Sequence, residues 1–210
     1  IYFIFDNAIT VQLIQAFMVA IPVIPIVLLC KHHKLSNQMA IAVSLIYVLY
    51  PATAGGTFYD IHENCFITFF LLMLAWAVEK KKNVAAVIFA ILSLMVKEEA
   101  PVYVFILGIF FLFSKKDKKR GVILIVASAI YFAMATAIVN SYGLGIQEYR
   151  FGNLYFTQDG GLIQVFETLL ANPGYAISQI IRNTNDNSMD KIGYIISMLV
   201  PVAAVLFTTG

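Results

Sequence analysis

The sequence predicts an all-α protein, a polytopic bundle of about seven transmembrane helices that includes several short helical hairpins. Three observations lead to this fold class. First, 60% of the 210 residues are hydrophobic and only 12% are charged, whereas a soluble domain is about half apolar and about a quarter charged. Second, the apolar residues form uninterrupted runs, and backbone exposed to lipid must satisfy its hydrogen bonds within a helix. Third, short clusters of basic residues separate these runs.

The apolar runs define the expected spans, and the basic clusters define their orientation. The spans are residues 8–30, 38–50, 65–78, 84–96, 101–113, 121–140 and 192–208. Basic clusters at 31–34, 80–82 and 115–120 each follow an odd-numbered span. Because Lys and Arg concentrate in cytoplasmic loops, all three clusters are expected on the cytoplasmic face of an inner membrane.

The acidic residues collect on the opposite face. The three clusters hold two, three and five of the 14 Lys and Arg residues, but of the 12 acids only Glu79 and Asp117 lie on the same side. The other acids fall in segments that are expected to face outward. We therefore expect polar chemistry at the outer face, membrane lipid as a partner and no nucleic-acid ligand.

Residues 83–114 are expected to fold back on themselves. Basic residues flank this segment on both sides, so both of its ends should be cytoplasmic. A single helix of this length would extend about 48 Å, against a hydrocarbon core of about 30 Å. The fold-back is expected at 97–101, where Pro101 can occupy the first turn of the returning helix. Each arm is then about 21 Å long, so the charges at the tip should lie below the outer surface of the membrane.

The preceding hairpin should have the same geometry. Its arms are 38–50 and 65–78, and its tip, 51–64, contains Gly55 and Gly56, which permit an irregular backbone. Irregular backbone at membrane depth is tolerated only where protein buries it or where it lines a cavity. We therefore expect the two tips to form one outward-facing cleft. The ionisable residues of that cleft would be Asp60, His62, Lys97, Glu98 and Glu99.

Residues 141–191 are expected to form an outer-face segment of a single transmembrane domain, 1–210. In 162–171 the apolar side chains fall on one helical face, and 175–181 is a second short apolar helix. Both are expected to lie along the outer leaflet as interfacial helices. The chain starts at Ile1 without Met or a signal sequence, which is typical of a fragment of a longer protein.

The tip of the first hairpin carries the sequence Asp60-Ile61-His62-Glu63. A carboxylate beside an imidazole can relay a proton, coordinate a divalent cation or hold the counterion of a phosphate. The alternative is a solvated loop in which Asp60 or Asn64 caps the next helix. Because ionisable groups at membrane depth are costly, a functional role is the default hypothesis for them.

The tip of the second hairpin carries Lys97-Glu98-Glu99. A charge at the centre of a span costs roughly 2.5–3.5 kcal/mol on insertion scales, so these three need partners. Lys97 could bind a lipid-linked phosphate, and a Glu could act as a base or as a ligand of a divalent cation such as Mg²⁺ or Mn²⁺. The alternative is an internal ion pair that only closes the tip.

Other notable residues lie outside the two tips. The stretch 149–152 (Tyr-Arg-Phe-Gly) offers an Arg fork for phosphate and aromatic rings for sugars, but an interfacial anchor would have the same composition. His32 and His33 lie in a basic loop and are expected to contact lipid headgroups. Pro22 and Pro25 are expected to kink the first span.

At these residues the sequence resembles a known family of bacterial membrane proteins, Domain of Unknown Function 2079. The resemblance covers nearly the whole chain. It rests on an ordered set of motifs: Leu49-Tyr50-Pro51, Phe58-Tyr59-Asp60-Ile61-His62, Lys97-Glu98-Glu99 and Arg150-Phe151-Gly152. That family is grouped with the GT-C-type glycosyltransferases, polytopic enzymes that transfer sugar from a polyprenyl-phosphate carrier at the outer face. The resemblance therefore implies a GT-C-like fold.

The resemblance also implies roles for individual residues. Asp60 and His62 match the family's Asp-x-His, the acidic pair matches at Glu98 and Glu99, and Glu63 departs from the pattern. GT-C relatives place an essential acid in their first outer loop, which is expected upstream of Ile1. The residues expected in catalysis are Asp60, His62, Glu98 and Glu99. Those expected to bind substrate or phosphate are Lys97, Arg150, Tyr149 and Glu63.

Three functions follow as hypotheses. The leading one is a GT-C-like glycosyltransferase that uses a polyprenyl-phosphate-linked sugar at the outer face. Buried charges and broken helices also mark transport sites, so the alternative is a transporter or lipid-handling protein without covalent chemistry. A structural or assembly subunit would tolerate the loss of the charges at both tips. The residues do not indicate the sugar, the acceptor, the metal or the oligomeric state.

Overall fold

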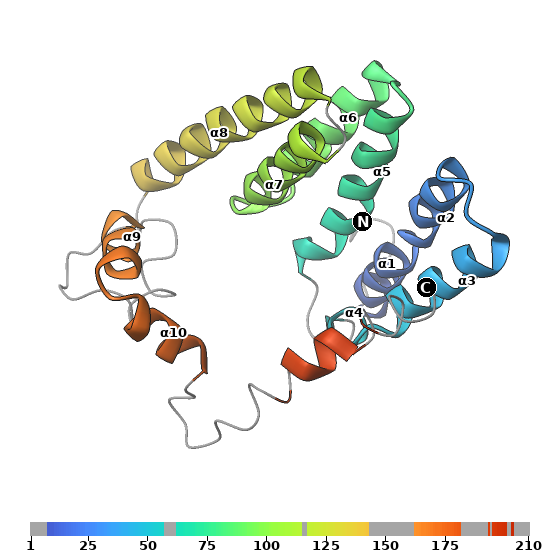
Figure 1. Ribbon diagram of the computed structural model, residues 1–210, viewed down its shortest axis with the longest axis horizontal. Coiled ribbons are helices and arrows are strands. Elements are labelled where there is room, and N and C mark those ends of the chain that lie inside the picture. Colours follow the sequence, from blue (N-terminus) through green and yellow to red (C-terminus); the bar gives the residue numbers. More distant parts are fainter. Residues whose placement is uncertain are drawn as a thin grey trace. The chain divides into compact units, whose positions relative to one another are not determined.

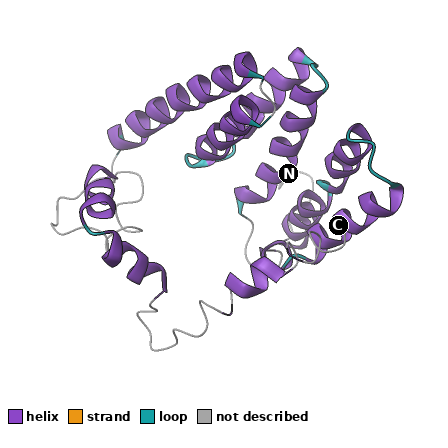
Figure 2. Ribbon diagram, viewed as in Figure 1, coloured by secondary structure: helices purple, strands orange, loops and turns teal. Residues whose placement is uncertain are grey.

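The computed structural model describes residues 8–56, 62–114, 117–142, 162–181, 193, 195–200 and 203 (Figure 1). In this described part the chain forms helices and no strand (Figure 2), which confirms the all-α prediction for these residues. The chain divides into two compact units, Ile1–Ala135 and Thr136–Gly210.

The first unit is a series of helices joined by short connections. They are α1 (Ala8–Ala20), α2 (Val23–His32), α3 (Asn37–Leu49), α4 (Pro51–Gly56), the 3₁₀ helix η1 (Glu63–Phe66), α5 (Ile67–Glu79), α6 (Asn83–Leu94), α7 (Ala100–Phe113) and α8 (Lys118–Ser141), whose last turns belong to the second unit. Sequential neighbours pack together, α2 with α3, α5 with α6 and α6 with α7, and α2 also contacts α5. Four of these helices, α3, α5, α6 and α7, match their predicted ranges to within two residues at each end.

The first expected span, 8–30, is broken where the prolines predict. Pro22 lies between α1 and α2 (φ −58°, ψ −16°) and has no N–H to donate. Just after this break, Ile24 N donates to the Ile21 carbonyl at 2.9 Å, three residues back rather than the four of an α-helix. Pro25 follows in the first turn of α2, where an N–H would have no partner within the helix. The span is therefore interrupted at Pro22, as expected for a proline, whereas Pro25 does not interrupt α2.

Among the described residues, two stretches are long and apolar enough to cross a membrane. They are Ile9–His32, with 24 residues over α1 and α2, and Lys118–Val139, with 22 residues in α8. The apolar helices α3, α6 and α7 have only 13, 12 and 14 residues, or about 18–21 Å against a hydrocarbon core of about 30 Å. The short hairpin arms are therefore present as helices, and the number of seven spans stays a prediction.

Two apolar clusters hold the first unit together. The larger joins α5, α6, α7 and α8 through Leu74, Val78, Leu94, Val104, Phe111 and Leu124. The smaller joins α2 to α3 through Ile26, Cys30 and Ala40. Ser93, fully buried beside the larger cluster, donates to the Phe89 carbonyl of its own helix at 2.7 Å. Its hydroxyl is thus satisfied inside an apolar interior.

The helices α7 and α8 pack with their backbones in contact at two glycines. A Cβ added to Gly121 would lie 2.8 Å from the Gly108 carbonyl oxygen and 2.8 Å from Leu112 N. Real Cβ atoms essentially never approach backbone that closely, so a larger residue would push the helices apart. Small residues allow this kind of approach between membrane helices. The contact fixes the α7–α8 hairpin near the basic residues that begin α8.

In the second unit the described helices are α9 (Leu162–Ala171) and α10 (Pro173–Ile181), which contact each other. α9 has the predicted bounds, and α10 starts two residues before the predicted range 175–181. Residues 193, 195–200 and 203 of the last expected span are helical. The positions of α9 and α10 in the outer leaflet, and the outer-face segment as a whole, stay predictions.

Candidate functional site

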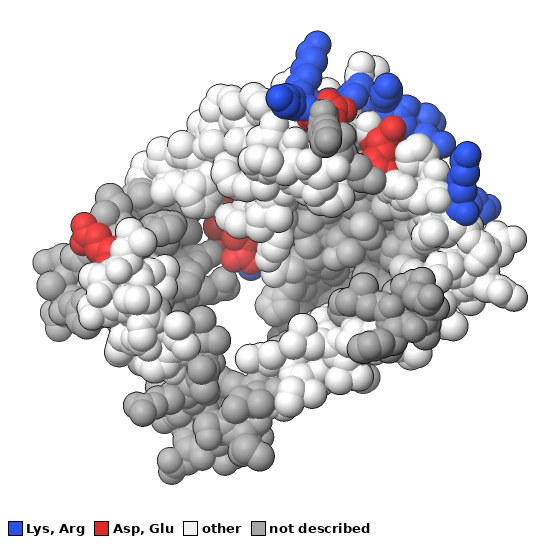
Figure 3. Space-filling model, viewed as in Figure 1, with Lys and Arg blue, Asp and Glu red and all other residues white. Residues whose placement is uncertain are grey.

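The charged side chains of the first unit form two groups at opposite ends of the helices. One group, the basic edge, comprises Lys31, Lys34, Lys80, Lys81, Lys82, Lys118, Lys119 and Arg120. Figure 3 shows Lys and Arg gathered along one edge, over the ends of α2 and α5 and the start of α8. The other group, the tip cluster, comprises Glu63, Lys97, Glu98 and Glu99, at the starts of α5 and α7. The tip cluster contains most of the predicted site residues that the structure describes.

The first tip is more regular than predicted, because 51–56 forms the short helix α4. Pro51 opens this helix, where its fixed φ is favourable and its missing N–H is not needed. On the return side, η1 begins at Glu63 and is preceded by His62 in extended conformation (φ −116°, ψ 136°). Neither η1 nor α5 has a side-chain cap, so the described residues do not show Asn64 capping α5. Asp60 lies outside the described residues.

The second tip is a tight turn between α6 and α7. Ala100 N bonds to the Lys97 carbonyl at 3.1 Å, and Val102 N bonds to the Glu99 carbonyl at 3.0 Å. Pro101 lies in the first turn of α7, as predicted, with its side chain buried. The turn therefore presents Lys97, Glu98 and Glu99 from a backbone fixed on both sides.

Lys97 joins the two tips. Its Nζ lies 3.0 Å from Glu63 Oε1 and 3.9 Å from Glu99 Oε1. The Lys97 side chain is only 12% exposed, whereas that of Glu63 is 48% exposed. Since Glu63 belongs to η1 and Lys97 to the α6–α7 turn, this salt bridge brings the tips of two hairpins into contact. The outward orientation of this contact stays a prediction.

The tip cluster contains more acid than base. It has three carboxylates, those of Glu63, Glu98 and Glu99, and one ammonium, that of Lys97, which contacts Glu63 and Glu99. A backbone hydrogen bond at Glu63, followed in effect by the hydrogen bond from Lys97, holds the pKa of Glu63 below its usual value. Glu63 is therefore ionised at neutral pH and its salt bridge is formed. Because two carboxylates already surround Lys97, it can bind a phosphate only by exchanging one of them.

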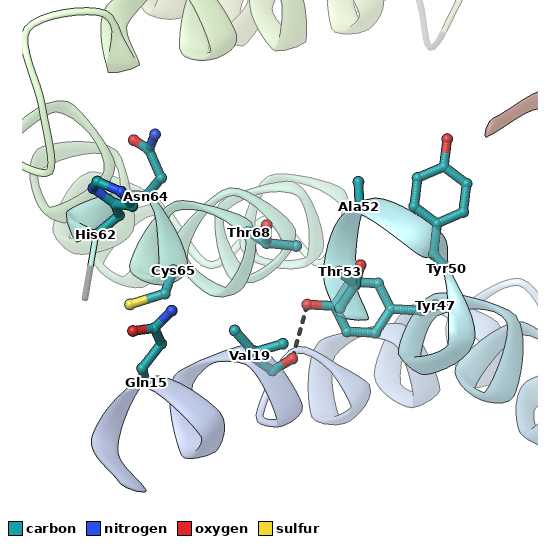
Figure 4. Close-up of a pocket in the computed structure, with 10 residues that line it drawn as sticks. All are labelled: Gln15, Val19, Tyr47, Tyr50, Ala52, Thr53, His62, Asn64, Cys65 and Thr68. Atoms are coloured by element: carbon teal, nitrogen blue, oxygen red, sulfur yellow. Dashed lines mark hydrogen bonds between the residues drawn. The ribbon is translucent and has the colours of Figure 1, made fainter. Parts of the chain in front are cut away.

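A cavity of about 470 Å³ lies next to the tip cluster (Figure 4). Its walls come from α1, α3, α4, α5 and the residues around η1. They are Gln15, Val19, Tyr47, Tyr50, Ala52, Thr53, His62, Asn64, Cys65 and Thr68. Because His62 and Asn64 flank Glu63 in the chain, the cavity and the salt bridge share the same short segment. The cavity thus combines apolar surface with several hydrogen-bonding side chains, beside a charged cluster.

Two side chains show how the cavity is built. The Tyr47 hydroxyl donates to the Val19 carbonyl at 2.9 Å and ties α3 to α1 (Figure 4). Gln15, on α1, is only 3% exposed and points toward Cys65. The sequence interpretation missed both residues. A signal existed for Gln15, because a polar side chain inside an apolar span faces the protein interior or a cavity.

Comparison with known proteins settles the family. A family model described as "Predicted membrane protein (DUF2079)" matches residues 1–210. The chain belongs to the DUF2079 family. No curated protein and no solved structure matches it. The resemblance inferred from the tip motifs is therefore confirmed at the level of the family, which is one of membrane proteins.

In this DUF2079 protein the structure brings together some of the predicted site residues. Glu63, Lys97 and Glu99 are in contact, and Glu98 lies half-buried in the same turn. His62 lines the adjacent cavity. Asp60, Tyr149 and Arg150 lie outside the described residues. The catalytic and binding roles of all these residues stay predictions.

No metal site emerges from the described residues of the DUF2079 chain. Within them, no group of three or more His, Cys, Asp or Glu side chains is arranged to hold a metal ion.

At the basic edge, acids lie beside bases. His33 Nε2 lies 2.8 Å from Glu79 Oε2, and His32 Nε2 lies 3.6 Å from the same oxygen. Arg120 Nη1 donates to Asp117 Oδ2 at 2.6 Å. The sequence interpretation gave the two histidines only lipid headgroups as partners. The structure adds Glu79 at the end of α5, which links the α2–α3 connection to α5.

Proposed function

We propose that this protein is a GT-C-like glycosyltransferase that uses a polyprenyl-phosphate-linked sugar at the outer face of the bacterial inner membrane. The observation that carries the proposal is the cavity of about 470 Å³ beside the tip cluster, which has amide, hydroxyl and imidazole side chains among its lining residues. Small-molecule sites measure about 300–1,000 Å³. Amide, hydroxyl and imidazole groups such as those of Gln15, Thr68 and His62 can pair with sugar hydroxyls.

In the proposed transfer, acidic side chains accept a proton and cationic side chains stabilise the leaving phosphate. The acceptor oxygen forms a bond to the anomeric carbon, and the bond from that carbon to the carrier phosphate breaks. A carboxylate takes the acceptor's proton, for which Glu98, Glu99 and Asp60 are the candidates, with His62 as a proton relay. The bonding electrons leave with polyprenyl phosphate, whose charge Lys97 and Arg150 would stabilise. Tyr149 would contact the sugar or the lipid.

The contacts of Lys97 suggest how a donor would enter the site. Lys97 Nζ lies 3.0 Å from Glu63 Oε1 and 3.9 Å from Glu99 Oε1. The interaction with Glu99 is therefore the weaker of the two. A donor phosphate would replace Glu99 on Lys97 while Glu63 keeps the two tips together. Phosphate binding would then free the Glu99 carboxylate from its contact with Lys97.

Sugar transfer by the full-length protein in proteoliposomes tests the proposal directly. Radiolabelled polyprenyl-phosphate sugars are supplied as donors, and transfer to an acceptor fraction is measured. The double variant Lys97→Ala, Arg150→Ala is expected to lose activity by about 100-fold or more, because it removes the charge stabilisation of the leaving phosphate. The matched control Lys34→Ala, Lys118→Ala removes two cations from the basic edge and should transfer sugar normally.

The two possible failures have different meanings. Normal turnover in the Lys97→Ala, Arg150→Ala variant would refute the roles assigned to these residues. A wild-type protein that transfers no sugar from any polyprenyl-phosphate donor would refute the transferase proposal itself.

One observation favours a second candidate, a transporter or lipid-handling protein without covalent chemistry. The α1–α2 break at Pro22 lies close to the cavity, because Val19 and Gln15 of α1 both line it. Interrupted helices beside polar cavities are typical of transport sites. Flux of a sugar or lipid into proteoliposomes, with no covalent product, would favour this candidate over the transferase.

A further inference from the structure

A second cavity, a groove of about 510 Å³, lies between α6 and α8 and is polar only at one end. The polar lining residues are Asn83, Asp117, Lys119 and Arg120, in or just before the first turns of the two helices. Further along, the lining is apolar and includes Val87, Ile91 and Ile123. The groove thus has a charged mouth at the basic edge and an apolar interior.

The length of the groove fits one leaflet of a bilayer. From Asn83 to Leu94 the α6 wall runs through 12 residues, or about 16–18 Å. Half of the hydrocarbon core is about 15 Å. Three of the apolar lining residues, Val87, Ile91 and Ile123, each have more than half of their surface exposed. Such a surface in a membrane protein matches the acyl chains of a lipid.

Arg120 is held in place at the mouth. Its Nη1 donates to Asp117 Oδ2 at 2.6 Å, and its Nη2 donates to Asn83 Oδ1 at 3.0 Å. The bond to Asn83 bridges the starts of α6 and α8, and the two bonds together fix the plane of the guanidinium. An Arg side chain has five N–H donors, so the fixed group has further donors for an anionic ligand.

The charge at the mouth is positive. Of the described residues that line the groove, Asp117 is the one acid. Its hydrogen bond from Arg120, with a smaller effect of nearby Lys81, holds the pKa of Asp117 below its usual value. One carboxylate therefore faces three cations, those of Lys81, Lys119 and Arg120. The surplus favours a ligand with negative charge.

The N-terminus of α6 adds to this surplus. Both α6 and α8 begin at the mouth, but the Asp117 side chain caps α8 by accepting from Arg120 N at 3.3 Å, whereas α6 has no side-chain cap. The first N–H groups of a helix lack partners within the helix and suit phosphate oxygens. This feature supports the site only in combination with the groove and its basic mouth.

We propose that the α6–α8 groove binds one anionic phospholipid, with its phosphate at Lys119 and Arg120 and an acyl chain along α6. An anionic diacyl lipid matches both the positive mouth and the apolar interior. A zwitterionic lipid would place an amine beside the same cations. The site lies at the opposite helix ends from the tip cluster and does not depend on the transferase proposal.

Photo-crosslinking in nanodiscs tests this site on the full-length protein. A benzophenone side chain is introduced at Ile91, which lines the groove, or at Ile88, which is equally exposed on α6 but does not line it. The nanodiscs contain phosphatidylglycerol as a minority lipid in phosphatidylcholine. Each Lys or Arg near the surface favours anionic lipid about fivefold. We expect the cross-linked lipid at position 91 to be enriched in phosphatidylglycerol by about fivefold or more, and that at position 88 to follow the bilayer ratio.

Charge variants identify the headgroup contact. Lys119→Gln, which keeps the Arg120–Asp117 pair, should lower the enrichment at position 91 by up to about fivefold. The control Lys31→Gln removes a cation from the basic edge on another hairpin and should leave the enrichment unchanged. Equal effects of the two substitutions would overturn the proposal.

A groove-filling variant tests the acyl-chain contact separately. Ala127→Trp fills the groove and should abolish lipid cross-linking at position 91, whereas Ala133→Trp, exposed on the same helix outside the lining, should preserve it. Absence of any lipid cross-link at position 91 in the otherwise unchanged protein would mean that protein covers the groove, and would overturn the proposal. Equal enrichment at positions 91 and 88 would do the same.

Discussion

The two ends of the first unit use charge in opposite ways. At the basic edge, the two acids that the structure describes each lie beside a base, Glu79 beside His33 and Asp117 beside Arg120, and the surplus is positive. In the tip cluster, Lys97 is the one cation beside three acids, of which it contacts Glu63 and Glu99, and the surplus is negative. The positive end adjoins a groove with an apolar interior, and the negative end adjoins a cavity that has polar side chains in its lining. One bundle thus presents a surface suited to lipid at one end and a surface suited to polar chemistry at the other.

The two ends also differ in what holds them together. Near the basic edge, α7 and α8 touch through backbone at Gly108 and Gly121. At the tips, the salt bridge of Lys97 connects η1 with the α6–α7 turn. Where backbones touch, the spacing of the two helices cannot vary, whereas a side chain in a salt bridge can exchange one charged partner for another. The comparison therefore predicts a rigid basic end and a tip cluster that can respond to a ligand.

The largest expected effect concerns the backbone contact. Gly121→Ala should destabilise the protein by about 1–3 kcal/mol, because the new Cβ would meet backbone atoms that cannot rotate away. The matched control is Gly174→Ala, because a Cβ there meets nothing within 4 Å. Unfolding of both variants in detergent micelles measures the difference. Equal stability of the two variants would contradict a rigid basic end.

The next effect concerns the single cation of the tip cluster. Lys97→Met leaves Glu63 and Glu99 without their ammonium and should cost about 1–2 kcal/mol, between the values for exposed and buried pairs, since Glu63 is half exposed. Lys119→Met at the basic edge should change stability in detergent by less than about 0.5 kcal/mol. The same unfolding assay compares them. If Lys119→Met cost as much, the tip salt bridge would have no special structural role.

The smallest effect is a pH dependence at the tip. The pKa of Glu63 is lowered in the folded protein, so its stabilising contribution is complete above its usual unfolded value and is lost as pH falls through the lower folded value. The contribution of an exposed pair is below about 1 kcal/mol. Stability titrated from pH 7 to pH 3 should therefore show a component that is complete at neutral pH and is lost as pH falls past the usual glutamate pKa of about 4.3. Glu63→Gln should remove that component, and an unchanged profile would contradict it.

Local features of the sequence were sufficient to predict most helices of the first unit. Uninterrupted apolar runs between charged turns located α3, α5, α6 and α7, Pro22 located the break after α1, and Pro101 located the start of α7. These signals are local because they depend on chain stiffness, on missing N–H groups and on the membrane as solvent. The short arms also implied that the charges of each tip would be close to protein partners.

The sequence could not predict which side chains meet. Lys97 pairs with Glu63, and His33 lies beside Glu79, although each pair belongs to different hairpins. Such pairings depend on how the helices pack, for which a single sequence has no local signal. The cavity was missed for the same reason, since its walls combine Gln15 with residues of α3 to α5. The helix α4 was missed because two glycines outweighed Pro51 in the interpretation of that tip.

The most direct test of the account is the side of the membrane that each end faces. Asn64→Cys, beside the tip cluster, and Lys118→Cys, at the basic edge, are each introduced into a Cys30→Ala, Cys65→Ala background. A membrane-impermeant maleimide is then added to spheroplasts before and after permeabilisation. The account predicts labelling of position 64 in intact spheroplasts and of position 118 only after permeabilisation. Labelling of both positions from the same side, or in the reverse order, would contradict it.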